Sequence, residues 1–225
     1  MTRLPQPPIA LLMDFDGVIL DSMPLKSQAF ATVYAGAPAA AIAEILAYQR
    51  LHGGVSRGVK FAHYERSVFG RSGDSDAVER LADAYREIVL EAVIACPFVP
   101  GALEFLQFAQ GKIALDVVSG TPHEELSEII SRRGLQGYFR CIVGAPTTKL
   151  EAFATIIDRY ALQAEDCAAI GDALTEYEGA KALHVPFIGV VPEGEVNQFP
   201  LHVPVVRNLT TLPGLLGMSI GRVAG

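Results

Sequence analysis

The chain has 225 residues, 50% of them hydrophobic, and a formal net charge of −7 at pH 7. This composition excludes a disordered chain, and the length allows a substantial core in one domain or in a core with an insertion. The negative charge argues against general binding to nucleic acid or membrane surfaces, and no apolar run approaches the roughly 18 residues of a membrane span.

The cysteines and the N-terminal segment indicate the compartment. Cys96, Cys141 and Cys167 are scattered and show no metal-ligand spacing. A sparse, odd number of cysteines is typical of reduced thiols, and we interpret all three as buried structural residues. The apolar run near the N-terminus is too short for a signal peptide. We therefore expect a cytoplasmic protein.

The first predicted element is a short apolar run, Ile9 to Met13, which is typical of a buried parallel strand. Asp14 and Asp16 follow it, and on an extended chain this spacing points both carboxylates to one side. Gly17 then allows the chain to turn. Open α/β sheets bind ligands at the carboxyl ends of their strands, so we expect a binding site here. The alternative is a strand that simply ends in an acidic turn.

Residues 21–96 contain no strand-like run and read as a helical block inserted into another unit. Proline in a first turn, glycines after the last turn and apolar spacings of three and four support this interpretation. The pattern predicts about four helices, at Pro24–Tyr34, Ala39–Leu51, Arg57–Phe69 and Asp76–Ala95.

After residue 96 the pattern alternates between helix and strand. Repeated β–α units predict a doubly wound α/β core, in which helices cover both faces of a parallel sheet. The expected strands are Ile113–Val118, Cys141–Val143, Cys167–Ile170, Phe187–Val191 and a short edge strand, Val203–Val206. The expected helices are Ala102–Gln110, His123–Arg133, Lys149–Tyr160 and Thr175–Leu183. Only the tail after Pro213 looks loosely specified.

Polar residues stand at the ends of three predicted strands. The first strand ends in the two acids, the second in Ser119-Gly120-Thr121 and a later one in Gly171-Asp172. Lys149 begins the helix before that last strand. Because carboxyl ends of parallel strands meet at one edge of a sheet, these groups can converge on one crevice. Taken singly, Ser119 also fits a helix cap and Lys149 a solvated surface charge.

These motifs, in this order, resemble those of the haloacid dehalogenase-like hydrolases, in particular the phosphatase and β-phosphoglucomutase-like subgroup with a helical cap. The resemblance covers essentially the whole chain. It implies a Rossmann-like catalytic core at residues 1–20 and 97–225 and a cap at 21–96. The matching residues are Asp14-Phe-Asp16-Gly17-Val, Val118-Ser119-Gly120-Thr121, Lys149 and Gly171-Asp172 with Glu176.

The resemblance also implies a role for each acid. Asp14 is expected to attack phosphorus and form an aspartyl-phosphate, with Asp16 as the general acid and base. A magnesium ion is expected on Asp14, Asp172 and the backbone carbonyl of Asp16. Glu176 stands where many relatives have aspartate, and we expect it to hold a metal-bound water, with the alternative that it only pairs with a lysine.

The remaining core residues are expected to bind the phosphate. The resemblance places Ser119, the Gly120 amide and Lys149 on the phosphate oxygens, where charge develops, with Thr121 beside them. Asp16 is the most discriminating residue, because a leaving alkoxide needs a proton and a leaving halide does not. It indicates C–O–P chemistry and argues against dehalogenation and phosphonate cleavage. Lys26 stands where related mutases have a histidine, which argues against a mutase.

The cap is expected to choose the substrate. The turn at 53–57, Gly-Gly-Val-Ser-Arg, resembles a cap turn whose arginine reaches a distal anionic group. On a helix after Ser56, the side chains of Arg57, Lys60 and Tyr64 share one face. If that face looks into the crevice, the substrate carries a second negative group that Arg57 and Lys60 bind. The alternative is an ordinary solvated basic face.

The sequence thus predicts a magnesium-dependent phosphatase for a small phosphorylated metabolite, phosphoglycolate-like or a sugar phosphate. A sugar phosphomutase with the same intermediate is the alternative within the family, and a catalytically silent binding module is the alternative outside it. We expect no nucleic-acid or membrane partner, and a monomer or homodimer.

Overall fold

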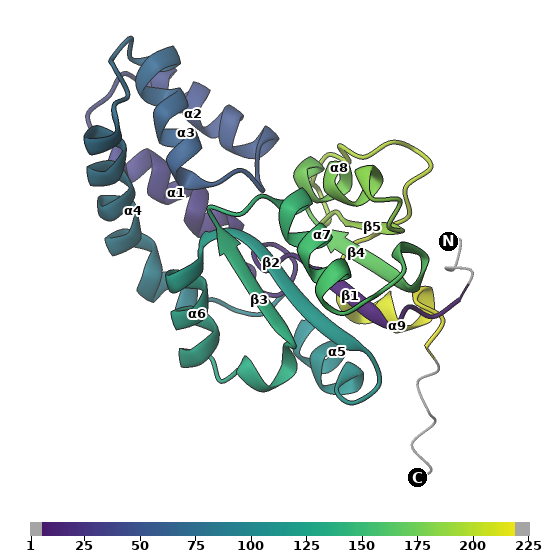
Figure 1. The fold of residues 1–225 in the computed structure, drawn as a ribbon. Coiled ribbons are helices and arrows are strands. Elements are labelled where there is room, and N and C mark those ends of the chain that lie inside the picture. Colours follow the sequence, from purple (N-terminus) through teal and green to yellow (C-terminus); the bar gives the residue numbers. More distant parts are fainter. Residues whose placement is uncertain (1–5, 219–225) are drawn as a thin grey trace.

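The computed structural model describes residues 6–218. Their centre is a six-stranded parallel sheet with the strand order β3-β2-β1-β4-β5-β6 (Figure 1). The strands are β1 (Ala10–Met13), β2 (Ala114–Pro122), β3 (Cys141–Ala145), β4 (Cys167–Gly171), β5 (Phe187–Val190) and β6 (Val205–Val206). All six predicted strands are confirmed, and β2 continues through its polar end to Pro122.

The central strand β1 is apolar because both faces of the sheet are covered. Leu11 and Met13 point into one hydrophobic cluster, and Ala10 and Leu12 point into another. The first cluster lies under the helices α5 (Ala102–Ala109), α6 (His123–Arg132) and α9 (Leu212–Leu215). The second lies under α7 (Lys149–Arg159) and α8 (Leu174–Ala182). The predicted doubly wound α/β core is therefore confirmed.

The four predicted cap helices are confirmed and lie together to one side of the sheet (Figure 1). They are α1 (Met23–Val33), α2 (Ala39–Leu51), α3 (Arg57–His63) and α4 (Ser75–Ala95). The predicted helix 57–69 runs its expected length, but α3 passes at Tyr64–Val68 into a π-helical turn. In this turn the amide of Phe69 donates to the carbonyl of Tyr64, 3.1 Å away.

The cap has an aromatic core of its own. Phe30 of α1 lies with its ring centroid 5.2 Å from Phe61, 5.6 Å from Tyr64 and 4.5 Å from Tyr85. These rings come from α1, α3, the π-turn and α4, so they tie all but α2 into one cluster. Ile45 of α2 is fully buried in the same hydrophobic cluster. Aromatic packing of this kind contributes beyond the area it buries.

Two chain segments connect the cap to the core. The amide of Asp21 donates to the carbonyl of Pro97 and the amide of Val99 to the carbonyl of Ile19, both at 3.0 Å. The outgoing and returning segments thus run side by side where the sequence analysis put the domain boundaries. The boundaries at residues 21 and 96 stay a prediction that this pairing supports. Residues 1–5 and 219–225 of the predicted core lie outside the described residues.

Ion pairs between α4 of the cap and α6 of the core form a second connection. Arg86 lies 2.8 Å from Glu128, and Arg132 lies 2.5 Å from Glu91. These pairs are solvated, so each contributes little to stability. Arg133 adds hydrogen bonds of 2.7 Å to the carbonyls of Ile94 and Cys96, near the end of α4.

The three cysteines are free thiols. Cys96 and Cys167 are buried, as predicted, but the prediction for Cys141 was wrong, because that residue is only half-buried. It begins β3, an edge strand of the sheet, which has a neighbour on one side only. In residues 6–218, no helix has the length and apolar character needed to cross a membrane.

The aromatic core of the cap yields a stability prediction. Phe61→Ala should lower the free energy of unfolding by about 3–5 kcal/mol, because Phe61 is fully buried and its removal leaves a cavity. Urea unfolding followed by circular dichroism measures this change. Val59→Ala, at an exposed position of the same helix, is the matched control and should cost no more than about 0.5 kcal/mol. Equal effects in the two variants would show that this cluster is not the core of the cap.

Candidate active site

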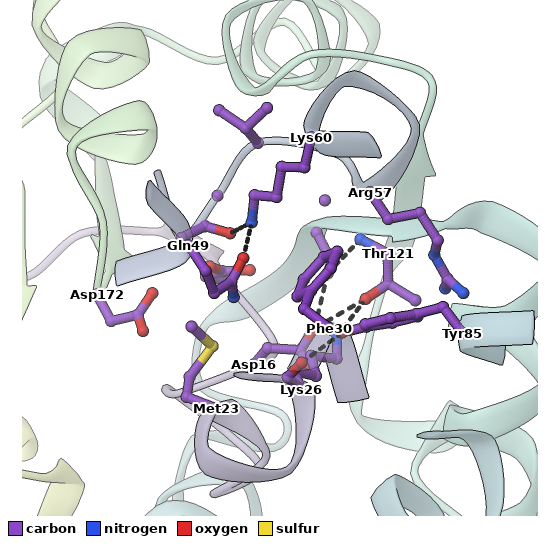
Figure 2. Close-up of a pocket in the computed structure, with 16 residues that line it drawn as sticks. Asp16, Met23, Lys26, Phe30, Gln49, Arg57, Lys60, Tyr85, Thr121 and Asp172 are labelled. Atoms are coloured by element: carbon purple, nitrogen blue, oxygen red, sulfur yellow. Dashed lines mark hydrogen bonds and ion pairs between the residues drawn. The ribbon is translucent and has the colours of Figure 1, made fainter. Parts of the chain in front are cut away.

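Three neighbouring strands bring the predicted polar groups together. β1 lies between β2 and β4, so the residues at the carboxyl ends of these strands meet at one edge of the sheet. They line a small cavity of about 40 Å³ between the core and the cap. From the core it is lined by Asp14, Asp16, Ser119, Gly120, Thr121 and Asp172, and from the cap by Met23, Lys26, Phe30, Gln49, Arg57, Lys60 and Tyr85 (Figure 2).

Three carboxylates form a cluster that fits a metal ion. Oxygen atoms of Asp14, Asp172 and Glu176 all lie within 4.8 Å of one another. Burial raises the pKa of Asp14 to about 7, with Glu176 and Asp16 adding to the rise against the opposing charge of Lys149. Burial and the repulsion of Asp14 and Glu176 raise the pKa of Asp172 as well. Carboxylate oxygens without sulfur or imidazole suit a hard divalent cation such as Mg²⁺.

Gly17 makes room for this cluster. It adopts a φ of +76°, which L side chains avoid, and a Cβ at this position would collide with the Asp172 carboxylate. The sequence analysis needed this glycine only for the turn. The structure shows that it also lets the chain after β1 approach the acid after β4.

Lys149 lies among the acids. Its Nζ atom is 2.8 Å from Asp14 Oδ1 and 2.8 Å from Glu176 Oε1, and it donates to the carbonyl of Val118 at 2.6 Å. Burial alone would lower the pKa of Lys149, but the two carboxylates outweigh it and raise that pKa, so the side chain is a permanent cation. The alternative of a solvated surface charge is therefore excluded. α7 places Lys149 through a capping box, in which Thr148 and Glu151 satisfy its first amides.

Glu176 is fully buried and fully engaged. Its Oε2 accepts a hydrogen bond from the Ala173 amide at 3.0 Å, and its Oε1 accepts one from the Thr175 hydroxyl at 2.9 Å. It therefore orients the loop after β4 and partners Lys149 as well as facing the other two acids. Its expected contact with the metal through water stays a prediction.

Asp16 is held in a different environment. Its Oδ1 accepts from the Ser22 hydroxyl at 2.6 Å, and its Oδ2 accepts from the hydroxyls of Thr121 at 2.9 Å and Ser119 at 3.2 Å. Lys26 Nζ lies 2.5 Å from the same Oδ2. Burial opposes ionisation of Asp16, but Lys26 and these hydrogen bonds lower its pKa to about 2.

Lys26 and Ser22 are site residues that the sequence analysis missed. Lys26 is buried and also donates to the Thr121 hydroxyl at 2.7 Å. The sequence analysis noted it only as the absence of a histidine. The available signal was its place one turn into the helix that follows the two acids, which must begin beside them.

The segment Ser119-Gly120-Thr121 at the end of β2 touches the cap. The Ser119 hydroxyl accepts a hydrogen bond from the Thr121 amide at 3.1 Å. A Cβ on Gly120 would lie 2.7 Å from the carbonyl oxygen of Gly54, and a Cβ on Gly54 would collide with Thr175 of the core. The turn at Gly53 and Gly54 therefore rests directly on the core, and the structure shows the cap closed.

The basic face of α3 is buried, so the alternative of a solvated face was wrong. Arg57 is 8% exposed and Lys60 is 3% exposed, and both line the cavity. Lys60 Nζ donates to Gln49 Oε1 at 2.6 Å and to the carbonyl of Gly53 at 3.0 Å. Burial and the nearby charge of Lys26 lower the pKa of Lys60 to about 7. Tyr64 shares this face but packs within the aromatic core of the cap.

Arg57 has a partner that the sequence analysis missed. Its Nη2 lies 2.5 Å from Oε2 of Glu125, on α6 of the core, and its guanidinium carbon lies 4.9 Å from the centroid of the Tyr85 ring. Glu125 has no sequence signal of its own, because acids are common in the first turn of a helix.

Comparisons with known proteins indicate one family. A family model described as haloacid dehalogenase-like hydrolase matches residues 10–184. A comparison with curated protein sequences gives no significant match.

Several solved structures share the fold although their sequence identity is low. This similarity supports the fold alone. YfnB from Bacillus subtilis, bound to magnesium, is 18% identical with a TM-score of 0.72, over 95% of this chain and 100% of that chain. CbbY from Rhodobacter sphaeroides, in complex with phosphate, is 17% identical with a TM-score of 0.74, over 94% and 100%. A predicted phosphoglycolate phosphatase from Haemophilus somnus is 14% identical with a TM-score of 0.73, over 92% and 97%.

The carboxylate cluster yields a prediction about metal binding. Asp172→Asn should weaken the binding of Mg²⁺ by tenfold or more, because it removes one of three converging carboxylates. Titration calorimetry with Mg²⁺ measures the affinity. Glu178→Gln is the matched control, since this acid is exposed on the following helix and should leave the affinity unchanged. Wild-type affinity in Asp172→Asn would remove Asp172 from the metal site.

Proposed function

The chain belongs to the haloacid dehalogenase-like hydrolase family, and from this premise we propose that it is a magnesium-dependent phosphatase acting on a small phosphorylated metabolite. The observation that carries the proposal is that the two acids after β1, Asp14 and Asp16, line the same cavity but have different electrostatic environments. Asp14 lies with the carboxylate cluster and Lys149, and Asp16 lies with hydroxyls and Lys26. A reaction that needs one nucleophile and one acid–base group needs such a division.

Charge is the first obstacle to this reaction, because a phosphate monoester and the Asp14 carboxylate repel each other. A magnesium ion bound by Asp14, Asp172 and the backbone carbonyl of Asp16 would supply positive charge to the phosphate oxygens. Lys149 supplies a second, permanent positive charge next to Asp14. The bound magnesium of YfnB and the bound phosphate of CbbY support this assignment by similarity of fold.

The chemical steps follow from the two acids. A carboxylate oxygen of Asp14 attacks phosphorus, the bond from phosphorus to the leaving oxygen breaks, and an aspartyl-phosphate forms. Asp16 gives the leaving oxygen its proton. Asp16 then takes a proton from water as the water attacks phosphorus, which releases phosphate and restores Asp14. In this proposal Ser119, the Gly120 amide and Lys149 hold the phosphate oxygens where charge develops, and Thr121 lies beside them.

Lys26 tunes Asp16 for the second step. With Lys26 at 2.5 Å and a pKa of about 2, Asp16 is ionised in the closed cavity, which is the form that takes a proton from water. For the first step Asp16 must carry a proton. The phosphate of a substrate brings negative charge next to Asp16 and offers Lys26 another anion, and both effects raise the pKa of Asp16. Lys26 is thus a positioning residue that also sets this pKa.

A sugar phosphomutase is the second candidate, and the closed cap over a small cavity is the observation that favours it. A mutase must keep water away from the aspartyl-phosphate and return the phosphoryl group to the sugar. Lys26, at the position where related mutases have a histidine, argues for the phosphatase. A catalytically silent binding module would not need Asp14, Asp16, Lys149 and Asp172 together on one cavity.

We also propose a cytoplasmic location and a monomeric or homodimeric state. The three free cysteines, two of them buried, support the location, since sparse unpaired thiols are typical of a reducing compartment.

Phosphate release tests the proposed function directly. With magnesium, a panel of phosphorylated sugars and carboxylic acids should include at least one ester that yields inorganic phosphate, and excess chelator should abolish the release. Isomerisation of a hexose phosphate without phosphate release would favour the mutase. Full activity in chelator would contradict the metal role, and no turnover of any ester would favour the silent binding module.

The two acids should respond differently to the leaving group. Asp14→Asn should abolish turnover of every ester, because the nucleophile is gone. Asp16→Asn should lose roughly 10²–10⁴-fold on alkyl phosphates but clearly less on p-nitrophenyl phosphate, whose leaving group needs little proton assistance. Steady-state kinetics on both ester types measures the difference. An Asp16→Asn enzyme that is equally impaired on both would refute the acid role.

A further inference from the structure

The pair formed by Arg57 and Glu125 bridges the cap and the core at the wall of the cavity. Figure 2 shows the Arg57 guanidinium above Tyr85, on the side of the cavity away from Lys60 and Gln49. Glu125 is 3% exposed, and both of its carboxylate oxygens are buried without a hydrogen-bond partner in the described residues. Its cationic neighbours there are Arg57 at 2.5 Å and Arg86 at 3.8 Å. Arg57 is therefore its principal partner.

This pair changes the charge that the cap offers to a substrate. Lys26 is paired with Asp16, and Arg57 is paired with Glu125. Lys60 has no acid within ion-pair distance in residues 6–218, but burial lowers its pKa to about 7, so near neutral pH much of it is uncharged. Before a substrate binds, the positive and negative charges on the cap side of the closed cavity therefore nearly cancel.

A second negative group on the substrate would disturb that balance. To meet it with an unbalanced positive charge, Arg57 would have to leave Glu125, whose carboxylate would then stay buried with only the more distant Arg86 beside it. Breaking a buried pair by removing one partner carries a large penalty. A hydroxyl group makes no such demand, because Gln49 and Lys60 can exchange hydrogen bonds with it while Arg57 stays on Glu125.

We propose that Glu125 is a specificity-determining residue, which holds Arg57 neutralised so that the site selects phosphate esters with a hydroxyl-bearing, uncharged leaving group. This inference rests on the proposed phosphatase function and narrows its substrate class to polyol or sugar phosphates. It replaces the expectation from sequence that Arg57 binds a second anionic group. Glu125 acts through Arg57, since it does not itself line the cavity.

Kinetics on two small esters tests the selection. We compare kcat/KM for phosphoglycolate, which carries a carboxylate, with kcat/KM for glycerol phosphate, which carries hydroxyls. The wild-type enzyme should prefer glycerol phosphate. Glu125→Gln frees the charge of Arg57 and should raise the ratio of phosphoglycolate to glycerol phosphate on the order of tenfold to a hundredfold. Glu128→Gln is the matched control, because it removes a half-buried acid that does not contact Arg57 from the same helix and should leave the ratio within about twofold.

A double variant guards against loss of folding in Glu125→Gln. Arg57→Met with Glu125→Leu removes both charges, and replacing a buried pair by apolar residues is often neutral for stability. Because Arg57 is already withheld from the substrate in the wild type, the double variant should keep the wild-type ratio within about threefold. A tenfold fall of the ratio would show that Arg57 binds the second anion despite Glu125 and would overturn the proposal.

Binding measurements separate this proposal from the proposed function. Calorimetry with magnesium uses phosphonoacetate and 2-hydroxyethylphosphonate, which are not turned over. Glu125→Gln should increase the affinity for phosphonoacetate relative to the affinity for 2-hydroxyethylphosphonate, by the same factor as in the kinetics. Absence of any turnover refutes the phosphatase function, while this binding comparison still decides on Glu125. An unchanged ratio in Glu125→Gln, an equal change in Glu128→Gln, or a wild-type preference for phosphoglycolate would each refute the role of Glu125.

Discussion

The crowding of three carboxylates at one edge of the sheet, two of them buried, is the constraint on which the rest of the site depends. Parallel strands deliver Asp14 and Asp172 to neighbouring positions, and Glu176 lies beside them. The Lys149 ammonium contacts Asp14 and Glu176, but one cation cannot balance three acids. The remaining negative charge matches a divalent cation. The strand topology gathers the negative charge, and Lys149 together with a bound divalent cation would offset it.

The same rule governs how the cap meets the core. Two of its buried cations, Lys26 and Arg57, find their acids on the other side of the boundary, at Asp16 and Glu125. Closing the cap and neutralising these charges are therefore one event. Buried ion pairs add little net stability because each ion loses its hydration, yet they tolerate few alternative arrangements. The two ion pairs thereby fix the position of the closed cap on the core, while the aromatic cluster stabilises the fold of the cap itself.

The sequence allowed most of the fold to be predicted, because each strand contains a short apolar run and three of the strands end in polar residues. α2 matches its predicted range at both ends. The π-turn after α3 could not be predicted, since apolar spacing does not reveal which carbonyl an amide selects. Within the site, Asp14 and Asp172 could be placed together because strand topology joins them. The ion-pair partners of Asp16 and Arg57 could not be predicted. Lys26 and Glu125 contact them only where the cap docks on the core, and local sequence patterns carry no information about docking.

The glycine turn of the cap has a mechanical consequence. Gly54 and Gly120 bring two backbones together without side chains between them, so the closed cap rests on the core through atoms that no change of side-chain conformation can move aside. In the proposed reaction, any opening of the cap has to separate this backbone contact. Lifting a four-helix body through water is slowed by friction. The viscosity of the surrounding solution, which has no part in the bond-breaking step, therefore affects the rate of such an opening, and two residues without side chains form the contact that must separate.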